Sequence, residues 1–248
     1  MTAVTTDADE LAALRELVAR ACRILAMEGL VEGILGHVSV RVGPEAMLVR
    51  CRGPQEQGLA FTTPDDVRLV DFAGRGEELT EGWRPPAELP IHAEVYRARP
   101  EAQSVVHAHP PAALLCGLAE LKPRPVFGAF NIPAMRLGLH GVPVYPRPVL
   151  ITRADLAEEM LDAMGDRPVC LLRGHGITVF GECVEEATVR AVDLNVLLHF
   201  TVETARLGAS PPDLSEEDLA ELPDLGARFN YEMGWAALSA KLGAAAPG

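Results

Sequence analysis

Helix-like and strand-like segments alternate along most of this chain, and that alternation limits the folds open to it. Residues 7–30 carry apolar side chains at steps of three and four, as one face of a helix requires, at Leu11, Leu14, Val18, Cys22 and Leu25. The next stretch, HVSVRV, alternates apolar and polar residues as a half-buried strand does. Strand patterns recur at AMLVRC, VRLVDF, SVVHAH, GVPVYP, VCLL and GITVF, and helix patterns at ELPIHAEVYRA, PAALLCGLAEL, TRADLAEEMLDAMG and from residue 184 onward. We therefore expect an α/β or α+β fold around a mixed sheet.

The length and composition of the chain fit one domain. It has 248 residues, of which 48% are hydrophobic and 23% charged, and no linker rich in Gly, Ser or Pro divides it. We predict a single domain over residues 1–248. The last residues, from about 240 to 248, end in GAAAPG, a composition that predicts a flexible tail.

The charge balance narrows the range of partners. The 35 acidic and 22 basic residues give a formal net charge of −13, which argues against nucleic acid because phosphate binding needs a positive surface. A small anionic substrate needs only a few local arginines and is compatible with this charge. No apolar run reaches the roughly 20 residues of a membrane helix, so we expect no membrane partner.

The cysteine content and the N-terminal sequence bear on the cellular compartment in which we expect the protein. The five cysteines form no CxxC pair and their number is odd. The first residues lack the basic-then-apolar pattern of a secretion signal. We expect a reduced, cytoplasmic protein.

The stretch SVVHAHPPAALL places His107 and His109 two residues apart at the end of a predicted strand. Residues i and i+2 of a strand project to the same face. Two imidazoles there can bind one divalent metal ion. The pattern alone is equally compatible with two partly buried histidines that hydrogen-bond to the backbone.

Two further segments bear on the choice between a metal site and two structural histidines. His175 follows the strand VCLL in the sequence RGHG, where the flanking glycines permit a sharp turn and leave the imidazole accessible. Glu88 lies 19 residues before His107, at the start of the helix predicted in PPAELPIHAEVY. Taken separately, His175 is compatible with a simple turn and Glu88 with a helix N-cap.

Together, the HxH pair, RGHG and the E-x-x-x-H of Glu88 and His92 resemble the class II aldolase/adducin family. The resemblance runs from GHVSVR through the long helix after RGHG, and it implies a central, mainly antiparallel sheet flanked by helices in three layers. It also implies a divalent metal held by His107, His109 and His175. Glu88 would be the catalytic acid/base, and His92 a supporting residue behind the ligands. The family usually forms homotetramers with active sites between subunits, so we expect a homotetramer.

The segments that hold phosphate in the sugar-phosphate aldolases of this family are altered. Where GN-x-S is expected the chain reads GHVS, so His37 replaces the asparagine. TTPDDV stands at the T-x-SG segment, with Asp65 and Asp66 in place of the small pair, and Pro-Ala at 86–87 replaces a serine pair. Aspartate and proline supply little of the N–H, hydroxyl or cationic groups that phosphate prefers. A phosphorylated sugar is therefore not the expected substrate.

The altered segments are more similar to the branch of this family that decarboxylates hydroxylated aromatic or heteroaromatic acids. Loss of CO2 leaves negative charge on carbon, which a divalent metal on an adjacent oxygen can stabilise. An acid such as Glu88 must then protonate the carbon. His37, as an imidazolium, could hydrogen-bond a substrate oxygen. Arg41 and Arg52 are candidates to bind the substrate carboxylate, although arginines on strands more often face solvent.

The remaining candidates carry weaker signals. Tyr231 and Arg228, in RFNYEMGW, would by default pack along a C-terminal helix, but residues of this kind can close a neighbouring subunit's active site in this family. His140 is expected in a loop and His199 at the edge of the core.

Four functions are compatible with the sequence. The leading hypothesis is a metal-dependent decarboxylase, and the first alternative is an aldolase acting on an unphosphorylated hydroxy-carbonyl substrate. An iron-dependent oxygenase and a non-catalytic adducin-like module are further alternatives, although three intact histidines and Glu88 argue against the module. Three histidine ligands do not choose between Zn, Mn, Fe and Co.

Overall fold

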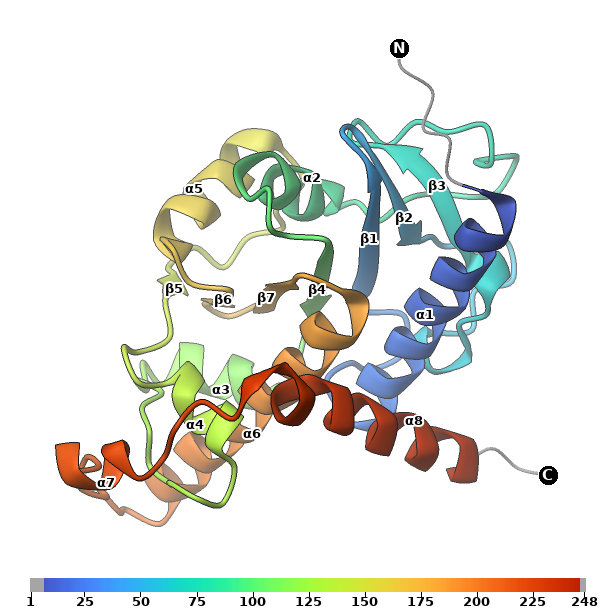
Figure 1. Cartoon of the computed structure of the whole chain (residues 1–248). Helices are drawn as coiled ribbons and strands as arrows, with labels where there is room; N and C mark the ends of the chain where they lie inside the picture. Colours follow the sequence, from blue (N-terminus) through green and yellow to red (C-terminus); the bar gives the residue numbers. More distant parts are fainter. Residues whose placement is uncertain (1–6, 246–248) are drawn as a thin grey trace.

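One sheet runs through the middle of the computed structural model, which describes residues 7–245 (Figure 1). Its seven strands are β1 (His37–Gly43), β2 (Ala46–Arg50), β3 (Val67–Asp71), β4 (Ser104–Ala108), β5 (Val144–Tyr145), β6 (Val169–Leu172) and β7 (Gly176–Gly181). They are ordered β3-β2-β1-β4-β7-β6-β5, and all neighbours are antiparallel except β5 and β6. The mainly antiparallel mixed sheet expected from the sequence is confirmed.

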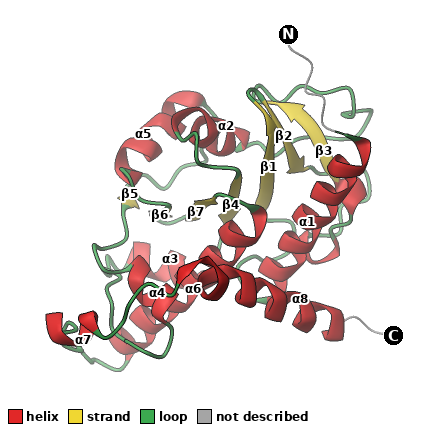
Figure 2. Cartoon of the chain, viewed as in Figure 1, coloured by secondary structure: helices red, strands yellow, loops and turns green. Residues whose placement is uncertain are grey.

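Helices cover both faces of this sheet (Figure 2). They are α1 (Ala8–Met27), α2 (Leu89–Ala98), α3 (Pro111–Leu118), α4 (Ile132–Leu137), α5 (Ala154–Met164), α6 (Val184–Arg206), α7 (Glu216–Ala220) and α8 (Met233–Ala245). The helices α2 and α5 pack on one face, and α1, α3 and α6 on the other. The expected three-layer arrangement is confirmed.

Successive strand residues pack into opposite layers, as the two-residue period of a strand requires. Met47 and Val49 of β2 join the cluster under α2 and α5, whereas Leu48 joins the cluster under α1 and α6. Val105 and Val106 of β4 divide in the same way. Each such buried side chain contributes about 1.5–3 kcal/mol of hydrophobic stabilisation, so both helix layers are fixed to the sheet that carries the site.

The first helix begins and ends where its sequence predicts. The Asp7 carboxylate accepts the Asp9 backbone N–H at the N-cap, and Gly29 beyond the last turn has a φ of +71°. The chain then reverses, and the Leu30 carbonyl accepts the His109 backbone N–H at 3.0 Å. The end of α1 thereby reaches the end of β4.

Several short elements differ from the sequence-based expectations. The helix α4, capped by Asn131, was not expected, because its six residues are too few to show a helical period. TTPDDV and the residues before it form two 3-10 turns, η1 (Leu59–Phe61) and η2 (Pro64–Asp66). The residues Arg228–Glu232 form one turn of π-helix, η3.

The C-terminal segment is helical as far as it is described. The residues expected to begin a flexible tail lie in α8, where Lys241 Nζ pairs with Glu28 Oε1 at 2.6 Å, and residues 246–248 lie outside the described part. Within residues 7–245, no helix combines the length and apolar character needed to cross a bilayer.

Candidate metal centre

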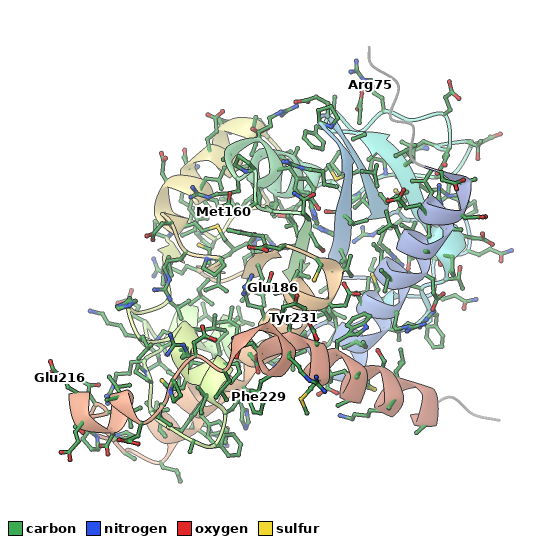
Figure 3. The ribbon with its side chains drawn as sticks, in the orientation of Figure 1. Arg75, Met160, Glu186, Glu216, Phe229 and Tyr231 are labelled. Atoms are coloured by element: carbon green, nitrogen blue, oxygen red, sulfur yellow. The ribbon has the colours of Figure 1, made fainter. Side chains whose placement is uncertain are left out.

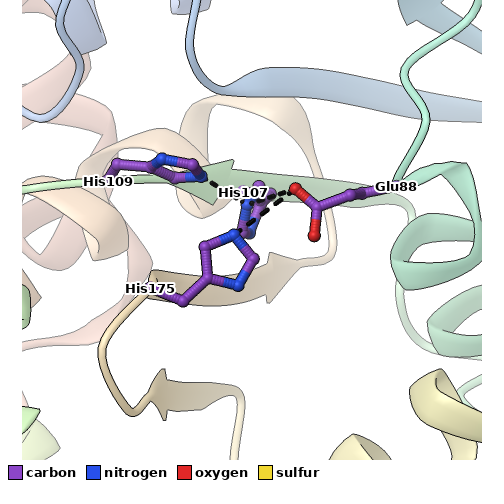
Figure 4. A group of neighbouring side chains, drawn as sticks. All are labelled: Glu88, His107, His109 and His175. Atoms are coloured by element: carbon purple, nitrogen blue, oxygen red, sulfur yellow. Dashed lines mark hydrogen bonds and ion pairs between the residues drawn. The ribbon is translucent and has the colours of Figure 1, made fainter. Parts of the chain in front are cut away.

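Four side chains from separate segments meet at the end of β4 (Figure 4), namely Glu88, His107, His109 and His175. One ligand-type atom from each lies within 4.8 Å of the others. The Nε2 atoms of His107 and His109 are 2.8 Å apart. Glu88 Oε2 lies 3.4 Å from Nε2 of both His107 and His175. The structure thus brings together the residues that the sequence pattern singled out as ligands and acid/base.

The sheet orients His107. This residue is fully buried in β4, and its Nδ1 lies 3.0 Å from the Ile177 carbonyl oxygen of β7. A carbonyl only accepts, so Nδ1 carries the proton and Nε2 presents its lone pair to the cluster. A hydrogen bond from the second ring nitrogen to a carbonyl is usual for metal-ligating histidines.

His109 lies one residue beyond β4 rather than within it. The strand ends at Ala108 because Pro110 and Pro111 cannot continue the ladder and instead start α3. The rings of His107 and His109 meet edge to face, with centroids 4.8 Å apart, and their Nε2 atoms point into one volume. The same-face geometry expected for the pair therefore holds although one member is outside the strand.

His175 lies in a turn between β6 and β7 that is bounded by glycines. The turn is closed by the His175 backbone N–H, which donates to the Leu172 carbonyl at 3.0 Å, and Gly174 has a φ of +65°. A Cβ atom on Gly176 would lie only 2.2 Å from the Ala108 carbonyl oxygen. Glycine at position 176 therefore allows the turn to approach β4 closely enough for the His175 ring to reach the cluster.

Glu88 stands at the N-cap position of α2 but does not cap that helix with its side chain. Its Oε1 accepts the Ile151 backbone N–H at 2.9 Å, which leaves Oε2 facing the histidines. Burial alone would raise the pKa of Glu88, but hydrogen bonds and charge interactions with His107 and His175 outweigh it and hold the pKa well below its ordinary value. The carboxylate is therefore ionised and available to the cluster.

The donor set fits a divalent metal ion. Ligand atoms about 2.0–2.1 Å from one tetrahedral ion lie roughly 3.3–3.4 Å apart, close to the separations of 2.8 and 3.4 Å found here. Both ring nitrogens of His175 are buried; Nε2 has only the Glu88 carboxylate, at 3.4 Å, and Nδ1 has no hydrogen-bond partner among residues 7–245, an arrangement that ligation through the ring would relieve. Burial lowers the pKa of His109 to about 3, so its imidazole is neutral, the form that ligates metals.

His37 lies directly beside the cluster without belonging to it. It pairs with His107 in the β1–β4 register, and the two ring centroids are 4.9 Å apart. Burial, reinforced by His92 and His107, lowers the pKa of His37 well below its ordinary value. The imidazolium expected from the sequence is therefore wrong, because neutral imidazole is the form that this buried position favours.

The two arginine candidates lie in different places. Arg52 follows β2, its guanidinium donates to the Ile34 carbonyl at 3.1 Å, and its charge is among those that lower the pKa of His109. Its charge therefore acts on the cluster from its place beside Ile34. Arg41 lies toward the opposite end of β1, with its guanidinium 5.0 Å from the centre of the Tyr96 ring. The structure brings only Arg52 toward the candidate ligands.

Asp66 of TTPDDV has a local structural role. Its Oδ2 accepts the backbone N–H of Thr63 at 2.8 Å and the Thr63 hydroxyl at 3.0 Å, which closes the turn of η2.

The C-terminal candidates lie away from the cluster of their own chain. Tyr231, in η3, lies near Glu186 (Figure 3) and within reach of Cys183. It lines a surface cavity of about 630 Å³ that includes none of the four cluster residues. Arg228 belongs to the same π-turn, and His140 and His199 are exposed.

Sequence reasoning missed the residues that support the cluster. Ser39 and Tyr96 form hydrogen bonds behind His37 and His92, and the Ile151 backbone holds Glu88. The sequence contained one signal for them. His37 and Ser39 lie on the same face of a strand, and His92 and Tyr96 lie one turn apart on a helix, so each pair could have been expected to project together.

Comparisons with known proteins agree with this fold. The family model "Class II Aldolase and Adducin N-terminal domain" matches residues 16–202. A 3,4-dihydroxyphthalate decarboxylase of Terrabacter sp. (strain DBF63) is 52% identical over 94% of this chain and 98% of its own. One from Arthrobacter keyseri is 51% identical over 94% and 96%. An L-fuculose 1-phosphate aldolase structure from Glaciozyma antarctica PI12 shares the fold, with a TM-score of 0.77 at 20% identity over 98% of this chain and 92% of that one.

The chain belongs to the class II aldolase/adducin family. Class II aldolases use a divalent metal ion, and the cluster of three histidines and Glu88 could bind one.

Proposed function

We propose that this protein is a metal-dependent lyase that decarboxylates a hydroxylated aromatic acid of the 3,4-dihydroxyphthalate class. The observation that carries the proposal is the intact cluster of three histidines and one glutamate in a chain 51% and 52% identical to decarboxylases of that substrate. The substrate would be a small dianion, which fits an acidic protein with a local arginine at the site.

His107, His109 and His175 would hold the metal ion. Once bound, a divalent ion supplies Lewis acidity that stabilises the negative charge left on the substrate as CO2 departs. Zn, Mn, Fe and Co are all compatible with histidine ligation. The buried Nδ1 bond of His107 to Ile177 keeps this ligand in the tautomer that ligation requires.

Glu88 would move the proton. Its Oε1 is held by the Ile151 N–H, so Oε2 is the oxygen free to react. In the proposed order of steps, Oε2 first takes the proton from the ring hydroxyl next to the departing carboxylate. The bond from ring carbon to carboxylate then breaks, and Oε2 returns the proton to that carbon. The ring oxygen regains its proton from solvent, so that one CO2 leaves and one hydrogen is added.

Arg52 and His37 would bind the anionic oxygens of the substrate. Arg52, whose charge acts on the cluster, offers a bidentate guanidinium to the carboxylate that is retained. His37, beside His107, offers a neutral ring nitrogen. Arg41 is assigned no such role, because its guanidinium lies over Tyr96.

The proposal extends to assembly and compartment. The protein would be a single-domain homotetramer in which Tyr231 approaches the active site of a neighbouring subunit, since it does not reach its own. It would act in the cytoplasm, in keeping with five free cysteines. It would act on no nucleic acid and at no membrane.

The test combines metal analysis with product detection. Protein purified without chelator or affinity metal is analysed for its elements, then supplied with 3,4-dihydroxyphthalate, and the release of CO2 is measured. About one metal ion per chain with CO2 release is expected. Bound metal without CO2 release would exclude the decarboxylase. Aldol cleavage of unphosphorylated hydroxy-carbonyl compounds or uptake of oxygen would then replace it, and failure to bind any metal would leave the adducin-like module.

A further inference from the structure

A chain of four buried polar side chains joins β1 to α2 directly behind the metal centre. His37 Nδ1 lies 2.6 Å from His92 Nε2, His92 Nδ1 lies 2.6 Å from Ser39 Oγ, and Ser39 Oγ lies 2.6 Å from the Tyr96 hydroxyl. His37 and Ser39 share one face of β1, and His92 and Tyr96 lie one turn apart on α2. None of the four is more than 5% exposed, so each of their protons needs an acceptor, either within the protein or in a molecule bound at the centre.

The end of the chain at Tyr96 sets the direction of its hydrogen bonds. The Tyr96 hydroxyl is buried, so its proton needs an acceptor within the protein. Ser39 Oγ, 2.6 Å away, is the acceptor available to it among the described residues. The reverse direction would leave the buried Tyr96 hydroxyl without an acceptor among the described residues, an arrangement that is costly.

The donor direction at Tyr96 determines the direction of the remaining hydrogen bonds as far as His37. Because Tyr96 donates to Ser39, the Ser39 hydroxyl donates to His92 Nδ1, and His92 then donates through Nε2 to His37 Nδ1. His37 must therefore carry its proton on Nε2. This nitrogen lies on the ring edge opposite His92.

The free edge of His37 faces the candidate centre. His37 pairs with His107 across the sheet. Besides His92, the groups whose charges act on His37 are His107, Glu88 and His109, all members of the cluster. The fixed N–H is therefore offered to whatever occupies the space beside His107.

We infer that Ser39, His92 and Tyr96 are positioning residues that hold His37 in its Nε2–H tautomer, so that this N–H donates to an anionic oxygen of the substrate. The inference rests on the proposed decarboxylase for the identity of the acceptor. The tautomer itself follows from the hydrogen bonds of the folded chain. A donor fixed before the substrate arrives needs no reorganisation as charge develops.

The tautomer can be measured without any activity. Full-length protein labelled with 15N-histidine and loaded with zinc is studied by solid-state NMR, which separates protonated from unprotonated ring nitrogens. The His37 signals are assigned by their loss in His37→Asn. The expected result is a protonated Nε2 and an unprotonated Nδ1 in His37. A protonated Nδ1 would overturn the inference and leave the proposed decarboxylase untouched.

Two variants test the chain of positioning residues. Tyr96→Phe removes the group that sets the direction, so the His37 signals should change to a mixture of both tautomers. Tyr145→Phe is the matched control, since Tyr145 is also buried but its hydroxyl bonds Glu159. His37 should keep its single tautomer in that control. An unchanged His37 tautomer in Tyr96→Phe would remove Tyr96 from the assignment.

Kinetics provide the second readout. With 3,4-dihydroxyphthalate as substrate, Tyr96→Phe and Ser39→Ala should each lower kcat by roughly ten-fold, which corresponds to the free energy of about one hydrogen bond. The metal content and the thermal midpoint of both variants should stay close to wild type. Tyr145→Phe should keep wild-type kcat. Wild-type kcat in both Tyr96→Phe and Ser39→Ala would show that the tautomer does not serve turnover. If wild-type protein releases no CO2, the proposed function fails and the NMR result still decides the tautomer.

Discussion

His37 and His107 are register partners on adjacent antiparallel strands, with ring centroids 4.9 Å apart, yet they have different hydrogen-bond partners. His107 turns Nδ1 to a backbone carbonyl and Nε2 to the cluster, whereas His37 turns Nδ1 to His92. The sheet therefore presents two neutral imidazoles side by side, one as a candidate ligand and one as a candidate donor.

Removal of one ligand should release the metal without unfolding the protein. In His109→Ala, the metal content and the turnover should fall to background, while the far-ultraviolet circular dichroism should match wild type, because the ring lies beyond the last residue of β4. His199→Ala, at an exposed position of α6, is the control and should keep both metal and turnover. Full metal occupancy in His109→Ala would contradict the ligand assignment.

Exchange of Glu88 for glutamine should separate chemistry from metal binding. The amide oxygen can still accept the Ile151 N–H, but the side chain can no longer take and return a proton. We expect kcat to fall by roughly 10²–10⁴, with metal content retained in elemental analysis. Glu94→Gln, on the same helix and paired with Arg97, should stay close to wild type. Loss of metal from Glu88→Gln would instead identify Glu88 as a ligand.

The candidate ligands and the candidate acid/base were predicted from the sequence because each lies in a short motif, and the resemblance of these motifs to the class II aldolase/adducin family implied their roles. His107 and His109 share a strand face, and the glycines around His175 indicate a tight turn, as the Gly176 contact with Ala108 confirms. The alternation of segments predicted an α/β or α+β fold around a mixed sheet, and the family resemblance implied the three layers and the mainly antiparallel strands, which the structure confirms. These features depend on residues close together in the sequence.

The supporting residues depend on contacts that are distant in the sequence. Ser39 reaches His92 and Tyr96 across separations of 53 and 57 residues, and no local pattern indicates that pairing. The charge state assigned to His37 was wrong for the same reason, since burial between the sheet and α2 sets its pKa.

A methyl group at position 176 should disturb the site through the backbone. In Gly176→Ala the new Cβ would lie 2.2 Å from the Ala108 carbonyl and 3.0 Å from His109 Cδ2, so the turn must move. We expect a loss of about 1–3 kcal/mol in the free energy of unfolding and weaker metal binding, measured by urea unfolding and metal titration. Gly243→Ala, in α8 with no atom within 4 Å of the new Cβ, is the control and should show no loss of stability. Wild-type values for both variants would refute the close approach.

Asp193 on α6 should make stability depend on pH. Burial raises its pKa to about 6 from 3.8, although the Asn131 amide donates to it at 2.9 Å. The folded state therefore binds the proton more tightly than the unfolded state. The ionised carboxylate destabilises the fold fully above about pH 6, and this penalty disappears below about pH 4.

The variant Asp193→Asn removes this charge and keeps an oxygen for the Asn131 amide. Its free energy of unfolding minus that of wild type should increase between about pH 4 and pH 6, by at most about 2–3 kcal/mol, and stay constant above. Urea unfolding across this pH range measures the difference, because titrations common to both proteins cancel. A flat difference for Asp193→Asn would show that this carboxyl is ionised equally in the folded and unfolded chains.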